Sequence, residues 1–302
     1  MQLDLVAEGL WFPEGPIAMA DGSIVLVEIR RGTLTRVTPD GRRTSIAELG
    51  GGPNGAAIGP DGAVYVCNNG GAWLWREGEV HIPHGAPPEY RGGSIQRVDL
   101  ASGRITTLYD SCNGKALNSP NDIVFDRQGG FWFTCLGQSD GEVRRLGALY
   151  YALPDGSKII RWRSGLTSPN GVGLSPDERT VYMADCILGR LMAYDLVAPG
   201  IIAEAKSPAG GRVVATLPDY QWLDSLAVEA DGRICVATLW KGGISVFEPD
   251  GKCEHIPFPD PVTTNICFGG ADMQDAWVTC SSTGRLYHCR WPRRGLRLSF
   301  SA

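Results

Sequence analysis

The chain has 302 residues, of which 43% are hydrophobic and 20% are charged, which is the balance of an ordinary globular protein. Its net charge is −5, which argues against nucleic acid as a partner, because nucleic-acid binding calls for a basic face. No stretch approaches the ~18 consecutive apolar residues of a membrane-spanning helix, so we expect no membrane partner.

The first predicted element is a strand over residues 3–10, which belongs to none of the repeated units that follow it. Residues 1–8 carry acids where a secretion signal carries Lys or Arg, and no long apolar core follows them. The nine cysteines include no Cys-x-x-Cys pair and are scattered through strand-like segments. We therefore expect buried free thiols and a cytoplasmic location.

From residue 14 onward one short phrase recurs six times, and each copy begins with an oxygen-bearing residue seven positions before a turn. These six residues, which we call the lead residues, are Glu14, Asn54, Asn121, Asn170, Asp224 and Asn265. Each is followed by small or apolar residues, a turn and a β-prone run, for example residues 23–27 and 63–66. Such runs bounded by Gly and Asp are typical of hairpins.

The spacing of the lead residues predicts a propeller. They lie between 40 and 67 positions apart, and each unit has room for about four antiparallel strands, as in a propeller blade. Six units predict an all-β, six-bladed β-propeller that occupies residues 1–302 as a single domain. The strand over residues 3–10 would then close the last blade as its outer strand. The longest spacing holds an insertion at about residues 81–93.

The first strand of each blade lines the central channel of a propeller, so all six lead side chains are expected in one mouth of that channel. Glu14 and Asp224 would repel each other there unless a cation lay between them. Carboxylate and amide oxygens suit Ca²⁺, Mg²⁺ or Mn²⁺, and Zn²⁺ is possible. Such a cation favours hydrolysis of a lactone or a phosphoester. The alternative is that these residues only hydrogen-bond neighbouring backbone at the strand starts.

Four motifs resemble, in sequence and in order, those of the SMP-30/gluconolactonase/LRE-like region family, namely the segments 11–16, 117–122, 168–177 and 222–232. That family consists of six-bladed propellers that are calcium- or zinc-dependent lactonases. The resemblance implies that Glu14, Asn170 and Asp224 bind the metal and that Asp224 is the catalytic base. It also implies that Asn121 completes the metal shell or contacts the substrate.

The chain departs from the family pattern at two positions. Ser119 stands where animal members carry a sugar-binding Arg, and Cys135 stands where many members carry Asp. For substrate binding we add Asn54, together with Arg91 of the insertion and Trp240, because an aromatic rim with one Arg suits a less polar or anionic substrate. The alternative for the tryptophan is packing within the propeller. The roles of Cys135, Asn54 and the sixth lead residue, Asn265, stay open.

The hypothesis from the sequence is a metal-dependent lactonase that opens a small lactone to a hydroxy acid, with Asp224 activating water. It would use one divalent cation, with Ca²⁺ preferred over Zn²⁺ or Mn²⁺, and its partner would be a small molecule. A monomer and a weak homo-oligomer are both compatible with it, and the lactone is not specified. The alternatives are an organophosphate or ester hydrolase of the diisopropylfluorophosphatase type and a non-catalytic propeller of the strictosidine-synthase-like type.

Overall fold

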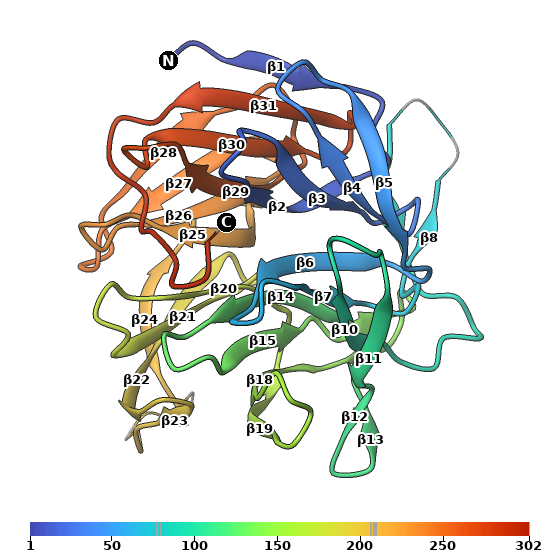
Figure 1. The fold of residues 1–302 in the computed structure, drawn as a ribbon. Coiled ribbons are helices and arrows are strands. Elements are labelled where there is room, and N and C mark those ends of the chain that lie inside the picture. The colour runs from blue at the N-terminus through green and yellow to red at the C-terminus, as the bar shows by residue number, and fades with distance from the viewer. Residues whose placement is uncertain (77, 79, 206, 208–209, 302) are drawn as a thin grey trace.

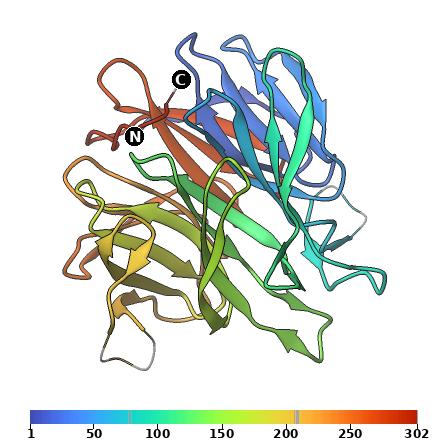
Figure 2. The same ribbon diagram turned by 60° about the horizontal axis from the view of Figure 1, so that its bottom comes forward.

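The computed structural model describes residues 1–76, 78, 80–205, 207 and 210–301. These residues form 31 β-strands and no helix, so no membrane-spanning helix occurs among them. Figures 1 and 2 show, from two directions, six sheets arranged around one axis. The predicted all-β, six-bladed propeller is therefore confirmed.

Each blade is an antiparallel sheet, and the first of its strands in sequence lies nearest the axis, except in the last blade, where β1 is outermost. The six inner strands are β2 (Pro13–Ala18), β6 (Pro53–Ile58), β14 (Pro120–Phe125), β20 (Pro169–Leu174), β25 (Trp222–Val228) and β29 (Thr263–Gly269).

The outer strands complete the blades in chain order. They are β3 (Ile24–Glu28), β4 (Thr33–Val37) and β5 (Arg43–Glu48); β7 (Val64–Asn68), β10 (Ser94–Val98) and β11 (Ile105–Tyr109); β15 (Phe131–Cys135), β18 (Gly147–Ala152) and β19 (Ile159–Leu166); β21 (Thr180–Asp185), β22 (Arg190–Ala198), β23 (Ile201–Ile202) and β24 (Arg212–Thr216); β26 (Ile234–Leu239), β27 (Gly243–Phe247) and β28 (Cys253–Pro257); and β30 (Asp275–Cys280), β31 (Arg285–Arg290) and β1 (Asp4–Ala7).

Three short hairpins project from this frame. They are β8–β9 (Leu74–Trp75 and Pro83–His84), β12–β13 (Ser111–Cys112 and Lys115–Ala116) and β16–β17 (Gln138–Ser139 and Arg144–Arg145). The first lies in the long connection between β7 and β10 and includes the start of the predicted insertion. The third lies between β15 and β18 of the third blade.

The N-terminal strand closes the ring as predicted. β1 pairs with β31, with Asp4 opposite His288, so the chain start supplies the outer strand of the last blade. The Ser281 hydroxyl of the last blade donates a hydrogen bond of 2.6 Å to the Pro13 carbonyl of the first. Both contacts join the two ends of the ring without a covalent link.

Every inner strand has a register shift in its pairing with the next strand. The lead residue of the strand lies either within this shift or at its edge. In β20 the shift falls between Pro169 and Val172, and in β25 it falls between Leu223 and Leu226. A β-bulge bends a strand and re-aims the side chains within it. The shifts thus turn the lead side chains out of the sheet plane and toward the channel.

The glycine that follows several lead residues allows the inner strands to converge. A Cβ atom on Gly15, whose φ is +51°, would lie 2.7 Å from the Asn54 carbonyl oxygen of the next blade. A Cβ atom on Gly171 would lie 2.6 Å from the Asp224 carbonyl oxygen. Neither contact has room for a side chain, so glycine is required for the approach.

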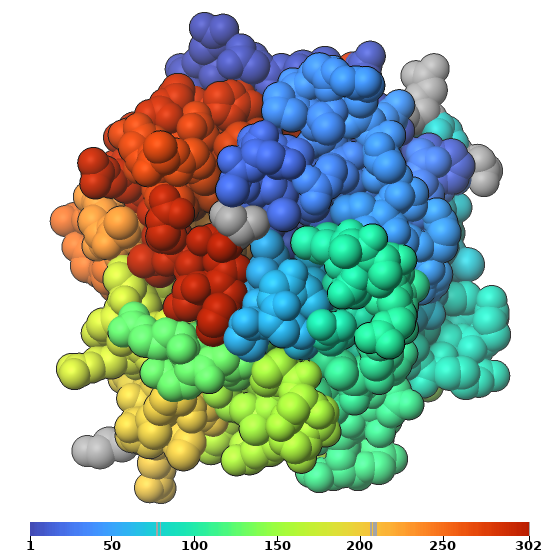
Figure 3. Space-filling view, viewed as in Figure 1, coloured from blue at the N-terminus to red at the C-terminus, as the bar shows by residue number. Residues whose placement is uncertain are grey.

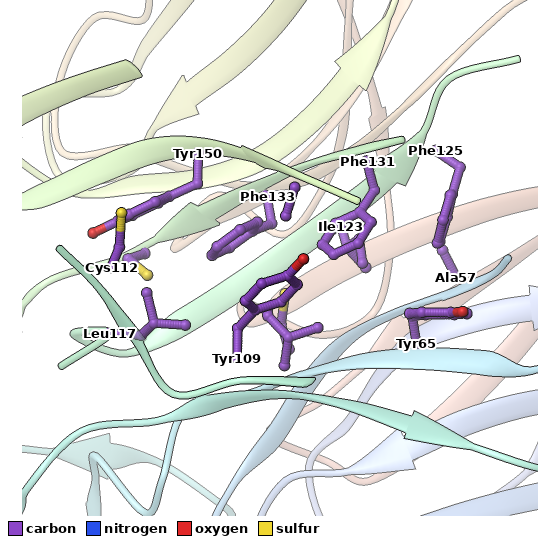
Figure 4. Close-up of a cluster of buried hydrophobic side chains, with 14 of the residues drawn as sticks. Ala57, Tyr65, Tyr109, Cys112, Leu117, Ile123, Phe125, Phe131, Phe133 and Tyr150 are labelled. Atoms are coloured by element: carbon purple, nitrogen blue, oxygen red, sulfur yellow. The ribbon is translucent and has the colours of Figure 1, made fainter. Parts of the chain in front are cut away.

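Aromatic side chains hold neighbouring blades together. Figure 4 shows Tyr65 and Tyr109 of the second blade facing Phe131 and Phe133 of the third. The Tyr65 ring meets the Phe125 ring of the third blade edge-on, with centroids 5.0 Å apart. Full burial of one such side chain stabilises the fold by about 1.5–3 kcal/mol. The blades are therefore fixed relative to one another, and so are the lead residues that they carry.

The C-terminal segment covers one end of the channel. A cavity of about 130 Å³ at that end is lined by residues of all six inner strands and by Leu296, Leu298 and Phe300. The Phe300 ring meets the Phe125 ring edge-on, with centroids 6.0 Å apart. Figure 3 shows this segment lying over the centre of the ring.

Candidate active site

A cavity of about 350 Å³ contains five of the six lead residues. They arrive on β2, β6, β14, β20 and β25, and they are Glu14, Asn54, Asn121, Asn170 and Asp224. All five are buried, and the most exposed of them, Asp224, has 9% of its surface accessible to solvent. The structure thus brings together the four residues that the sequence predicted as metal ligands.

Asn265, the sixth lead residue, departs from the expected ring. It lines the cavity under the C-terminal segment and not the cavity that holds the other five. Its amide Nδ2 donates a hydrogen bond of 2.6 Å to Glu14 Oε2, and its Oδ1 accepts one from the Ile266 backbone. The Gly15 backbone donates to the same Glu14 oxygen. Asn265 and Gly15 therefore orient the Glu14 carboxylate together.

The two carboxyl groups of the cavity are costly to ionise in isolation. Burial raises the pKa of Glu14 well above its ordinary 4.5, and the charge of Asp224 raises it further. Burial raises the pKa of Asp224 to about 8, although a hydrogen bond from the Asn170 side chain opposes the shift. Both groups would be carboxylates at neutral pH only beside a compensating positive charge.

A third buried carboxyl group, Asp122, lies next to this pair and was missed by the sequence reasoning. Its Oδ2 accepts a hydrogen bond of 3.1 Å from the Val172 backbone of the next blade, and its Oδ1 accepts one from Ile123. Burial raises its pKa to about 7, and its charge raises the pKa of Asp224. The one available signal was that Asp122 directly follows a lead residue, where three other units have glycine.

Two amide oxygens of the cavity have no hydrogen-bond partner. Asn121 Oδ1 and Asn170 Oδ1 are buried and unpaired among the residues that the structure describes. An unpaired buried oxygen is costly unless something else satisfies it. Within the same part of the chain, no three His, Cys, Asp or Glu side chains converge on a metal position. A cation here would be held by Glu14 and Asp224 together with these amide oxygens, a donor set that fits a hard divalent ion.

The backbone of this region is held by its own polar contacts. The Thr134 hydroxyl of the third blade donates to the Asn170 carbonyl of the fourth and accepts a hydrogen bond from the Asp122 backbone. The Ser168 backbone and hydroxyl both donate to Asp185 Oδ1 at 3.0 Å. These contacts fix the start of β20, from which Asn170 projects.

The predicted substrate-binding residues separate in the structure. Asn54 and Trp240 line the cavity, whereas Arg91 does not. The Arg91 guanidinium donates to the backbone carbonyls of Pro88 and Tyr90 within the insertion itself. The arginine that does line the cavity is Arg144, on the β16–β17 hairpin. No pattern in the sequence distinguished it from the other surface arginines.

The walls of the cavity are largely aromatic and aliphatic. Trp222 and Trp240 pack together with ring centroids 5.6 Å apart, and the exposed Tyr220 extends this group outward. Phe12 and Trp73 line another part of the wall. Trp240 has a φ of +71°, an uncommon conformation for a bulky residue and one that recurs at functional sites.

Cys135 does not line this cavity. It is buried in β15, and burial raises the pKa of its thiol. The Ser119 side chain is buried and does not line the cavity, and the Ser119 backbone donates to the Tyr90 hydroxyl and so anchors the insertion. His84 of the insertion reaches the cavity wall.

A family model for the SMP-30/Gluconolactonase/LRE-like region matches residues 12–282. The chain is 25% identical over 298 residues to a gluconolactonase from Zymomonas mobilis, covering 88% of this chain and 76% of that relative. It is similar to the solved structure of a gluconolactonase from Xanthomonas campestris, with a TM-score of 0.74, 25% identity and coverage of 96% and 89%. A calcium-binding regucalcin from Agrobacterium tumefaciens shares the fold, with a TM-score of 0.72, 19% identity and coverage of 96% and 95%.

Proposed function

The chain belongs to the SMP-30/Gluconolactonase/LRE-like region family, and from this premise we propose that it is a metal-dependent lactone hydrolase formed by one domain over residues 1–302. One observation carries the proposal. Two buried carboxyl groups, Glu14 and Asp224, share a cavity with two unpaired amide oxygens, those of Asn121 and Asn170. The gluconolactonase relatives support lactones as the substrate class.

Glu14, Asn170 and Asp224 would hold the cation, and Asn121 would complete its shell or contact the substrate. Oxygen donors of this kind favour Ca²⁺, with Mn²⁺ and Zn²⁺ as alternatives. When bound, the cation supplies a positive charge that polarises a carbonyl and lowers the pKa of water. It also allows both carboxyl groups to ionise in spite of their burial.

Asp224 is the proposed general base. The Asn170 side chain hydrogen-bonds its carboxyl group and so fixes its orientation. Its carboxylate takes a proton from the attacking water as the new C–O bond forms at the lactone carbonyl. The ring C–O bond then breaks, the leaving alkoxide takes up the proton, and the product is a hydroxy acid. Asn265 keeps Glu14 in place throughout, and the aromatic wall limits the access of bulk water.

The test is a lactone panel assayed before and after exhaustive chelation, followed by reloading with Ca²⁺, Mn²⁺ or Zn²⁺. We expect hydrolysis to disappear with the cation and to return on reloading. Full activity in chelated protein would refute metal dependence. Preferential turnover of aryl esters or phosphotriesters would favour the organophosphate hydrolase, and absence of both turnover and metal uptake would favour a non-catalytic propeller.

We also propose that the enzyme acts in the cytoplasm on a small molecule. All nine cysteines are free thiols, and seven of them are buried. A chain rich in unpaired cysteines is suited to a reducing compartment. Fractionation of the native host would check this location.

A further inference from the structure

We propose that Arg144 binds a carboxylate group of the substrate, so that the lactone accepted by this cavity is an anionic one. The inference rests on the proposed lactone hydrolysis for the identity of the reacting ring. The anion site itself rests on separate observations of Arg144.

Arg144 is the positive charge of the cavity. Among the described residues that line it, no other is a lysine or an arginine. The side chain comes from β17, in a hairpin inserted between β15 and β18, and is half-buried. The neighbouring Arg145 lies in the same short strand but is exposed and does not line the cavity.

Two backbone carbonyls hold the guanidinium in place. Its Nε donates to the Thr167 carbonyl at 2.7 Å, and its Nη2 donates to the Leu136 carbonyl at 3.1 Å. A guanidinium has five N–H donors, so these two contacts orient the group without exhausting it. An arginine fixed in this way loses little side-chain entropy when it binds a ligand.

The charge of Arg144 has no carboxylate partner within ion-pair distance among the described residues. Both of its hydrogen-bond acceptors are neutral backbone carbonyls. The charge of Asp185 acts on Arg144 from beyond ion-pair distance, and the Asp185 carboxylate accepts a hydrogen bond from Ser168. Burial lowers the pKa of Arg144, which reflects the cost of partial desolvation without a counter-ion. A ligand carboxylate would supply that counter-ion, and paired N–H groups match its geometry.

The rest of the cavity orients such a ligand. Glu14 and Asp224 mark the polar floor where the lactone carbonyl reacts, while Trp222 and Trp240 offer apolar faces to the body of the molecule. A cavity of about 350 Å³ accommodates a small ligand. The ligand would place its carbonyl at the floor and its carboxylate at Arg144.

The test compares two lactones of nearly equal shape, 5-oxotetrahydrofuran-2-carboxylate and γ-valerolactone, in which a methyl group replaces the carboxylate. We expect the wild type to prefer the anionic lactone by about tenfold or more in kcat/KM. Arg144→Gln should raise KM for that lactone by about 10- to 100-fold, the usual range for a lost charge-assisted contact, and should lower the preference for it over γ-valerolactone by a similar factor. Arg144→Lys should keep part of the preference, and the matched control Arg145→Gln should keep all of it.

A binding measurement separates this inference from the hydrolysis itself. Tryptophan fluorescence, which Trp222 and Trp240 would report, is followed as 2-hydroxyglutarate or 4-hydroxypentanoate, the two ring-opened products, is added. Weaker binding of 2-hydroxyglutarate to the Arg144→Gln variant supports the anion site, even if neither lactone is hydrolysed and the proposed reaction fails. Equal binding of 2-hydroxyglutarate by wild type and variant overturns the anion site, whether or not the lactones are hydrolysed.

Discussion

At the residue scale, the site depends on side chains that would be unfavourable anywhere else in the fold. Glu14 and Asp224 are buried near each other, and Asn121 and Asn170, which line the same cavity, have buried side-chain oxygens without a hydrogen-bond partner among the described residues. Buried carboxyl groups with strongly raised pKa values are typical of functional sites. A cation would relieve both problems at once.

Substitution of the carboxyl groups should separate catalysis from folding. We expect Asp224→Asn to lower kcat by about 10²–10⁴, because it removes the general base, and to weaken cation binding. Glu14→Gln should weaken cation binding for lack of charge. The control is Asp231→Asn, at the exposed turn of the same blade, which should change neither property. Isothermal titration with Ca²⁺ and steady-state kinetics provide the measurements, and near-normal turnover by Asp224→Asn would contradict the assignment.

The raised pKa values also predict how stability depends on pH. In chelated protein, Asp224 has a pKa of about 8 and Asp122 a pKa of about 7, against an ordinary value of 3.8. At pH values between the ordinary and the raised pKa, these two carboxyl groups are protonated in the folded state and ionised in the unfolded state. The free energy of unfolding should therefore fall as pH rises from about 4 to 8, by up to about 1.4 kcal/mol per pH unit for each group.

Urea denaturation at several pH values in the presence of a chelator measures this slope. Asp122→Asn should reduce the slope between about pH 4 and 7, because one of the groups that bind protons in the folded state, which also include Glu14 and Asp224, is gone. Added Ca²⁺ should stabilise the protein more at pH 8 than at pH 5, since it competes with protons for Asp224. A stability that rises over this range in chelated protein would contradict the prediction.

At the element scale, the inner strands position the site through their bulges and their close approach. Gly171 follows the lead residue Asn170, and its α-carbon faces the carbonyl of Asp224 on the next inner strand. The separation of β20 and β25 therefore sets the separation of two proposed metal ligands.

Gly171→Ala should disturb both stability and metal binding. The added Cβ would lie 2.6 Å from the Asp224 carbonyl oxygen and 2.8 Å from the Leu226 nitrogen, so the strands must shift. We expect a loss of about 1–3 kcal/mol in the free energy of unfolding and weaker Ca²⁺ binding. Gly62→Ala is the control. Its φ of +75° strains an added side chain, but no atom lies within 4 Å of the added Cβ, so it should lower stability without weakening Ca²⁺ binding. Unchanged Ca²⁺ affinity in Gly171→Ala would show that the strand separation does not matter to the site.

The repeat in the sequence explains how much of the fold and of the candidate site was predictable. The repeats predicted the blades, the inner strands and five cavity residues, because hairpin spacing is a local property of the chain. They did not predict that Asn265 would turn to Glu14, a contact that spans 251 positions. They also did not single out Arg144, because the direction of the β16–β17 hairpin follows from tertiary packing. Asp122 was visible beside Asn121, but its orientation depends on the bulge in β14.

At the scale of the whole molecule, the ring is closed by the pairing of β1 with β31. Removal of residues 1–8 should leave β31 as an unpaired edge strand, which favours pairing with another molecule. We expect a lower urea midpoint and concentration-dependent association in size-exclusion chromatography. Removal of residues 1–3, which precede β1, is the control. A truncated protein that stays monomeric with an unchanged midpoint would show that this strand is dispensable.

The position of the C-terminal segment affects how substrate enters the protein and how product leaves it. Because Leu296, Leu298 and Phe300 lie over one end of the channel, we expect small molecules to reach the lead residues from the other cavity, past the tryptophan wall. A lactone that enters past the tryptophan wall must leave, as its hydroxy acid, by the same opening. Each turnover therefore begins only after the previous product has been released, and accumulated product should inhibit the enzyme by competing with substrate for the cavity.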